Sequence, residues 1–407
     1  MTLVSDILAR MDALAGERSQ WERVWSDIAD FCLPDHARFT PGSTAGQRYD
    51  MMAQAPSSID RGRARYDDTA LRAVDRLASG MESLVTPQSE KWHGLAVTDP
   101  LAPEPSDEEL EYFERYRDYM FAVRYNSRSG FIGAHQKALR SAIALGTGIV
   151  FLEECMGREA HATPALYRYL PLSECYLAVD AQGEPDTLYR RFTMTARQMV
   201  QRFGEENLAD PVLRAADNIT DKDRTFTVIH AVEPRREAGS AAGKAMKDAP
   251  FASFYVDRDH NKLIGQSGFF EFPFVVYYWS PVETLPYAQS PVMMALSDIK
   301  GLNAIRKTTL RGLQQYFDPP IAIAHDGVMN RPNLNPRAVN YNAIDANGRM
   351  RIQPIITQQR PDFAQEIIDA ERKGVNDSLY VTLFQILMQN PNTVSYTHLT
   401  LPTKRIV

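Results

Sequence analysis

Cysteine is scarce in this sequence, and no two cysteines stand at a spacing typical of metal binding or redox chemistry. The 407 residues contain Cys32, Cys155 and Cys175, an odd number without a CxxC pair. This pattern argues against a disulfide framework and against a cysteine zinc site. It predicts reduced thiols, as in proteins that stay inside the cell.

Long apolar runs and a surplus of positive charge are also missing. No stretch approaches the roughly 20 consecutive apolar residues that a membrane-spanning helix needs. The N-terminal segment MTLVSDILARMDAL is amphipathic and contains two aspartates, which is untypical of a signal peptide. A net charge of −6 argues against a surface that is basic overall, as in proteins that coat nucleic acid. We therefore expect a soluble protein without a membrane partner, made in the cytoplasm.

Sequence signatures of catalysis are absent as well. There is no Walker A phosphate loop, no GxSxG nucleophile elbow and no HxH, HxxxH or HExxH histidine pair. The tripeptide 146–148, Gly-Thr-Gly, is closest to a phosphate loop, but it follows a predicted helix and precedes a predicted strand. A phosphate site needs the reverse order, so a helix cap is favoured. Glu153 and Glu154 are neighbours on a strand and point to opposite faces. We predict no enzymatic activity, no catalytic or metal-binding residue and no cofactor.

Hydrophobic periodicity predicts a mixed α+β body over residues 1–289. The first 33 residues have helical spacing with Gly16 between two apolar sets, which indicates a helix pair or one broken helix. Further helices are predicted after a cap at Asp68 or Thr69, near 106–126, near 129–145, and after a cap at Thr195. Strand patterns occupy 91–97, 149–154, 165–180, 186–195, 225–235, 251–259 and 269–280.

Two long helices are predicted after this body, at 290–317 and 362–389. In the first, Ser290 is a suitable N-cap and Pro291 suits the first helical position. At about 1.5 Å per residue, this helix would be a rod of roughly 40 Å. Its apolar stripe comprises Val292, Leu296, Ile299, Leu302, Ile305, Leu310, Leu313 and Phe317. The stripe of the second helix comprises Phe363, Ile367, Ala370, Gly374, Leu379, Leu383 and Leu387.

The two rods differ in charge, and both contain glycine. The basic residues predicted to fall off the first stripe are Lys300, Arg306, Lys307 and Arg311. The acidic residues in the first half of the second rod include Asp362, Glu366 and Asp369. The glycines that would let a neighbouring helix approach closely are Gly301, Gly312 and Gly374.

Two such rods cannot bury both apolar stripes fully against each other as an isolated pair. Packing against copies of the same chain would solve this, and a heterologous contact that closes by rotation makes a ring. From periodicity alone, a monomeric helical domain is the alternative.

Several segments, in order along the chain, resemble a known family. RARYDDTALRAVDRLASGMESLVTPQSEKWHGL, ALGTGIVFLEE and LPLSECYLAVDAQGEPDTLYRRFTMTARQMVQRFG come first. EFPFVVYYW and YAQSPVMMALSDIKGLNAIRKTTLRGLQQYFDPPIAIAHDG follow. Together they resemble the portal, or head-to-tail connector, proteins of podovirus-type tailed phages similar to T7, over residues 1–393. The chain departs from this pattern at Tyr278 and at Ala288-Gln289, where the family commonly has arginine.

The resemblance implies a portal-like architecture. It assigns a mixed α/β wing body to 1–289, a first stem helix to 290–317, a clip to 318–360 and a second stem helix to 362–389. Residues 394–407 do not fit the family pattern and are expected to be a non-native tail. The C-terminal crown of the family would then be missing.

The resemblance also implies a function in the virion, at the unique capsid vertex. It predicts a dodecameric ring through which double-stranded DNA is packaged and ejected without being read by sequence. The implied partners are the terminase large subunit, a tail adaptor, and the major capsid and scaffolding proteins. The basic residues of the first rod would line the tunnel or pair with the acidic residues of a neighbouring subunit. Two alternatives remain open: a monomeric head-tail adaptor or scaffolding protein and, with less support, a DNA-processing enzyme.

Overall fold

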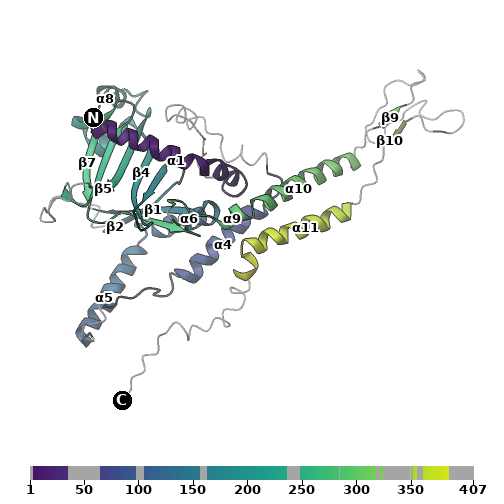
Figure 1. Ribbon diagram of the computed structural model, residues 1–407, viewed down its shortest axis with the longest axis horizontal. Helices are drawn as coiled ribbons and strands as arrows, with labels where there is room; N and C mark the ends of the chain where they lie inside the picture. Colours follow the sequence, from purple (N-terminus) through teal and green to yellow (C-terminus); the bar gives the residue numbers. More distant parts are fainter. Residues whose placement is uncertain are drawn as a thin grey trace, which may run out of the picture. The chain divides into compact units, whose positions relative to one another are not determined.

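The protein divides into two compact units (Figure 1). One contains Met1–Leu296 and Asn376–Val407, and the other contains Ser297–Val375. The computed structural model describes residues 3–34, 65–97, 105–155, 163–235, 248–283, 285–317, 321–323, 349, 352–354 and 361–384.

The first unit mixes helices and strands, which confirms the predicted α+β class. Its helices are α1 (Leu3–Cys32), α4 (Thr69–Val85), α5 (Asp107–Arg124), α6 (Phe131–Leu145), α7 (Ala196–Phe203), α8 (Asp210–Asp217) and α9 (Pro291–Met294), with a 3-10 turn at Glu205–Asn207. Its strands are β1 (Thr147–Glu154), β2 (Ala165–Leu170), β3 (Cys175–Val179), β4 (Pro185–Thr195), β5 (Thr225–Pro234), β6 (Phe251–Asp257), β7 (Lys262–Phe269) and β8 (Phe274–Tyr278).

The larger sheet is an antiparallel meander in the order β3-β4-β5-β6-β7. Successive residues of a strand face opposite sides of a sheet, so Val228 and Ile229 of β5 contribute to different cores. On the side of Ile229, the sheet packs against the apolar stripe of α1 (Figure 1). On the side of Val228, it packs against α7 and α8. Both faces are therefore covered within the chain.

The smaller sheet has the antiparallel order β2-β1-β8 and packs against α6. In α6, ten of fifteen residues are buried. The second half of α1 reaches this region, where the indole Nε1 of Trp25 donates a hydrogen bond to the carbonyl of Leu145 at 3.0 Å. Helix α1 thus contacts the larger sheet with its first half and α6 with its second.

Helix caps explain several element boundaries that the sequence predicts correctly. Ser106 and Glu109 form a capping box at the start of α5, and Thr195 and Gln198 form another at the start of α7. At the start of α4, Asp68 holds the N-cap position without a side-chain capping bond. The carboxylate of Asp67 instead accepts the Thr69 amide at 2.9 Å.

Helix α1 is one continuous helix, so the predicted break at Gly16 is wrong. Gly16 is exposed, and a Cβ placed there would have no atom within 4 Å. A glycine inside a helix costs about 1 kcal/mol relative to alanine. The side chains of Met11 and Leu14, before Gly16 in the chain, and of Trp25, after it, are buried, and their burial offsets this cost.

The segment 91–97 does not form the predicted strand. Its backbone is irregular, and its side chains contact the C-terminal half of α5. Lys91 forms an ion pair with Asp118 at 2.5 Å, and the Trp92 indole donates to the hydroxyl of Tyr125 at 3.0 Å. The alternating pattern of this segment therefore reflects side-chain contacts to a helix rather than pairing with another strand. Helix α8 and strand β7, in contrast, were not among the predicted elements.

The first predicted rod is two helices rather than one. The short α9 ends at Met294, and α10 (Leu296–Phe317) begins after the non-helical residue Ala295. The second predicted rod ends earlier than expected, because α11 spans Pro361–Ser378. Tyr380 then has a positive φ of 56°, residues 381–384 are helical again, and 385–389 lie outside the described residues.

The second unit contains α10 from Ser297, strands β9 (Ile321–Ile323) and β10 (Ile352–Pro354), and α11 to Val375. The two strands pair antiparallel, with Ile323 opposite Ile352. Most of the predicted clip, 318–360, lies outside the described residues, as does the predicted tail, 394–407.

Candidate functional site

The predicted start of the first rod is fixed to the body by Ser290. Its hydroxyl accepts the amide of Met293 at 3.0 Å, as an N-cap does, and donates to the carbonyl of Ala144 at 2.8 Å. The side chain is fully buried. One residue therefore caps α9 and ties it to the last turn of α6.

The tripeptide 146–148, which follows α6, contacts the segment just before Ser290. Gly146 is the C-cap of α6 with a φ of 85°, and a Cβ there would lie 1.9 Å from the carbonyl oxygen of Ala288. At Gly148, a Cβ would lie 2.2 Å from the carbonyl oxygen of Ala138. The hydroxyl of Thr147 accepts the amide of Ala288 at 3.2 Å. The predicted helix cap is therefore confirmed, and both glycines permit close backbone packing.

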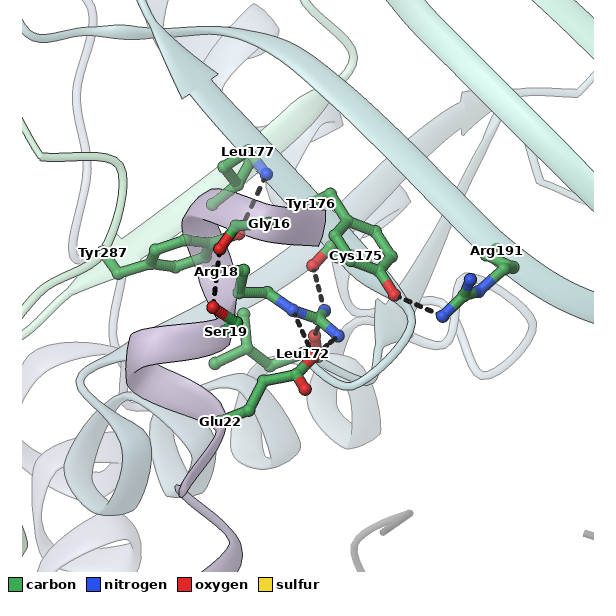
Figure 2. A network of polar contacts seen from close by, with 10 residues as sticks. All are labelled: Gly16, Arg18, Ser19, Glu22, Leu172, Cys175, Tyr176, Leu177, Arg191 and Tyr287. Carbon is green, nitrogen blue, oxygen red and sulfur yellow. Dashed lines mark hydrogen bonds and ion pairs between the residues drawn. The ribbon is translucent and has the colours of Figure 1, made fainter. Parts of the chain in front are cut away.

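The loop that precedes Ser290 is held by Tyr287. Its hydroxyl accepts the amide of Leu177 at 3.2 Å (Figure 2). Its ring also meets the indole of Trp25 edge-on, with the ring centroids 5.0 Å apart. Burial raises the pKa of the Tyr287 phenol, which therefore stays neutral. This contact joins the loop to α1 and β3.

A buried arginine, Arg18, completes the attachment of α1 (Figure 2). Its guanidinium donates to the carbonyls of Leu172 and Cys175 at 2.9 and 2.7 Å, and it forms an ion pair with Glu22. It also lies 3.7 Å from the ring centroid of Tyr176. Arg18 is not among the residues predicted from the sequence. Its only sequence signal is a spacing of four residues from Glu22, which many surface pairs share.

Three of the four predicted basic residues share one face of α10. With about 100° of rotation per residue, Lys300, Lys307 and Arg311 project within roughly 20° of one direction. Arg306 does not belong to this face. By the same rotation it lies on the side of Ile299 and Leu302, so the prediction that it falls off the apolar stripe is wrong. We call Lys300, Lys307 and Arg311 the basic face of α10.

The apolar stripe of α10 is covered unevenly. Ile299 and Leu302 are buried within the single chain, whereas Leu310 is exposed and Leu313 is half-buried. The first turns of the stripe are therefore covered without a neighbouring copy. Its later described turns remain partly open.

The buried face of α11 differs from the predicted stripe. Ile368 and Val375 are fully buried, while Ala370 and Gly374 of the predicted stripe are exposed and Ile367 is half-buried. Leu379 of the predicted stripe, just beyond the end of α11, is fully buried. The helix has two apolar lines, and the line with Ile368 and Val375 is the buried one. The side chain of Phe363 lies outside the described residues.

The predicted acidic residues are only partly described. Glu366 is exposed. The Oδ1 atom of Asp369 accepts a hydrogen bond from the side-chain Nε2 of Gln365 at 3.0 Å and lies 3.5 Å from a guanidinium nitrogen of Arg372. The side chain of Asp362 lies outside the described residues. At least one of the three predicted acids therefore already has a cationic partner on its own helix.

The predicted packing glycines have no close contact within the chain where this is described. A Cβ at Gly301 or Gly374 would have no atom within 4 Å. Gly312 is half-buried. Their use in packing against another copy stays a prediction.

The described residues contain neither a metal-binding cluster nor a membrane-spanning helix. Among them, no group of three or more His, Cys, Asp or Glu side chains could hold a metal ion. No described helix has the length and apolar character needed to cross a bilayer.

Residues 4–401 match the family described as "Bacteriophage head to tail connecting protein", and the chain belongs to this family. The resemblance seen in the sequence is thereby confirmed. The match extends into 394–407, where a non-native tail is predicted, and that prediction remains untested.

Two curated relatives are similar over almost the whole chain. The portal protein of Salmonella phage epsilon15 is 29% identical over 397 residues, which cover 96% of this chain and 66% of that protein. The probable portal protein of Bordetella phage BPP-1 is 25% identical over 395 residues, which cover 95% of this chain and 66% of that protein. The chain thus spans 66% of the length of each of these curated relatives.

Proposed function

We propose that this chain is a portal subunit. Copies of it would form a ring, expected to be a dodecamer, at the unique capsid vertex, and double-stranded DNA would pass through this ring during packaging and ejection. The observation that carries the proposal is the family match over residues 4–401. The names of both relatives support it.

The basic face of α10 suits a passage for DNA. Lys300 is seven residues from Lys307 and eleven from Arg311, or about 10 and 16 Å along the helix axis. Duplex DNA carries one negative charge per about 1.7 Å, so such a face would meet only a few phosphates from each subunit. Weak contacts of this kind would guide DNA without holding it. The same cations could pair with Glu366, Asp369 or Asp362 of a neighbouring subunit.

We assign the protein partners of the ring to the clip, residues 318–360, and to the body, residues 1–289. The segment 318–360 would form the clip that docks the terminase large subunit during packaging and a tail adaptor afterwards. The body, residues 1–289, would lie against the major capsid and scaffolding proteins. ATP hydrolysis would belong to the terminase, and the portal subunit itself would not be an enzyme.

Negative-stain imaging and sedimentation of the purified chain at high concentration test this proposal. Annular particles with a central channel are expected. A chain that sediments as a single copy at every concentration would contradict the ring and would favour a monomeric adaptor or scaffolding protein.

A further inference from the structure

Helix α5 is long, well capped and almost uncovered. None of its 18 residues is buried, although it contains seven aromatic or long aliphatic side chains. Tyr112, Tyr116 and Tyr119 are 61%, 46% and 57% exposed. Their spacing of four and three residues places them on one face, and their rings follow one another at centroid distances of 6.1 and 6.3 Å. We call these three residues the tyrosine face.

The chain covers another side of α5 and leaves the tyrosine face open. Near the C-terminal end of the helix, Arg124 lies over the ring of Trp92 at 4.8 Å, and Phe121 stacks on His93 at 5.9 Å. Phe121 lies on the side of the helix opposite the tyrosine face, and Arg124 projects about 110° away from that face. A row of exposed tyrosines is unusual on a surface without a partner, because these residues are enriched in interfaces.

The tyrosine face lies in an acidic part of the helix. The carboxylates in its first two turns, all exposed, are those of Asp107, Glu108, Glu109, Glu111 and Glu114. One nearby arginine, Arg115, pairs with Glu111 at 3.2 Å. A surface that covers this face should therefore be basic.

The same chain presents a basic surface on α4 and α6. The Asp75 carboxylate of α4 and the Arg140 guanidinium of α6 form an ion pair at 2.7 Å, which joins the two helices. The exposed cations Arg72 and Arg76 of α4 and Lys137 of α6 all lie within one helical turn of this pair. We call this the α4–α6 basic surface.

We propose that the tyrosine face of one copy docks on the α4–α6 basic surface of a second copy. The inference rests on the proposed ring function, and it assigns a specific contact within that ring. The two surfaces are complementary in charge, and both are exposed on the same chain. Because they are different surfaces, the contact is heterologous and repeats from copy to copy until the ring closes. Truncation of tyrosines at the centre of an interface often removes much of the binding free energy.

A charge-swap experiment tests this contact through assembly, measured by sedimentation and negative-stain imaging. The variant Glu108→Lys with Glu111→Lys, and the variant Arg72→Glu with Arg76→Glu, should each raise the concentration needed for half-assembly at least about tenfold. The combination of all four substitutions should restore assembly, because the attraction is then reversed in sign on both surfaces. Rising salt concentration should reduce these differences.

A second variant separates the aromatic contribution from charge. Tyr112→Ala with Tyr116→Ala and Tyr119→Ala keeps high helix propensity and should also weaken assembly at least about tenfold. Ile219→Ala, at a residue that is 84% exposed outside both surfaces, is the matched control and should not change assembly. Circular dichroism checks that each variant is folded.

The outcomes distinguish this contact from the ring itself. If the unaltered chain forms rings and the charge and tyrosine variants form them equally well, the docking contact is overturned while the proposed function stands. If each charge variant weakens assembly but their combination does not restore it, the pairing of these two surfaces is overturned. If the unaltered chain never assembles, both proposals fail.

Discussion

Helices α5 and α6 follow one another in the sequence, yet they are used in opposite ways. In α6, ten of fifteen residues are buried, whereas in α5 none of eighteen is. Both have clear helix boundaries, so their difference lies in packing and not in local helix formation. A helix covered by its own chain contributes to stability, and a helix with an open aromatic face is available for assembly.

The comparison extends to the rest of the molecule. In the body around α6, the buried side chains of Ser290, Thr147 and Arg18 form hydrogen bonds within the chain. Parts of α10 and α11 resemble α5, because Leu310 and Ala370 remain exposed. We therefore expect substitutions in the body to change stability, and those on the open faces to change assembly.

The largest effect is expected at the end of α6. Gly146→Ala would place a methyl group against the carbonyl oxygen of Ala288, in a backbone conformation that disfavours side chains. We expect a loss of more than about 4 kcal/mol in the free energy of unfolding, measured by urea denaturation. Gly183→Ala has a similar φ of 89° but nothing within 4 Å, and should cost only about 1 to 2 kcal/mol. If both variants lost the same free energy of unfolding, the cost would come from the backbone conformation and not from close packing against Ala288.

Two ion pairs with the same spacing of four residues allow the stability of the body to be compared with that of α5. Arg18 and Glu22 form a buried pair four residues apart, and Arg115 and Glu111 form an exposed one. Arg18→Met leaves Glu22 as an uncompensated buried charge and should cost about 3 to 5 kcal/mol in urea denaturation. Arg115→Met should change stability by less than about 0.5 kcal/mol.

Rescue separates the charge effect from packing at Arg18. Replacing both members, Arg18→Met with Glu22→Gln, should recover part of the loss, because no buried charge is then left alone. If the double variant is as unstable as the single one, the hydrogen bonds to Leu172 and Cys175 are the main contribution of Arg18.

Acidification should weaken the body through α6. His135 is buried between the hydroxyls of Thr86 and Tyr277, at 3.1 and 3.0 Å. Burial, with a smaller contribution from Arg124, lowers the pKa of His135 below its usual value. The unfolded chain therefore binds the proton more readily, and stability is lost as the pH falls through the unfolded value of about 6.5.

The measurement is the free energy of unfolding at pH 7 and pH 5. One such group contributes at most about 1.4 kcal/mol per pH unit. His135→Gln should reduce the loss on acidification, and other buried histidines such as His230 would account for what remains. An unchanged loss in this variant would rule out His135 as a contributor.

Local signals made much of the body predictable from the sequence. The capping boxes at Ser106 and Thr195, and the glycine at 146, mark helix ends by short-range chemistry alone. The Ser-Pro start at 290 is equally local. Such features are set by neighbouring residues, so one sequence is enough to find them.

Features that depend on distant partners could not be predicted. Arg18 is a core residue only because carbonyls of Leu172 and Cys175 come near it in the fold. The break at Ala295 is hidden because the apolar spacing continues across it. In α11, two apolar lines compete, and only the fold shows that Ile368 lies on the buried one.

The smallest expected change separates stability from assembly on α5. Tyr116→Ala removes a stacking contact with Tyr112 worth about 0.2 to 0.5 kcal/mol but gains helix propensity. We expect a change of less than about 0.5 kcal/mol in the free energy of unfolding of the dilute, single-copy chain. Ile143→Ala in α6, where the side chain is fully buried, is the control and should cost about 2 to 5 kcal/mol. A loss above about 1 kcal/mol at Tyr116 would mean that α5 is covered within its own chain. The tyrosine face would then not be open to a partner, and α5 would not differ from α6 in this respect.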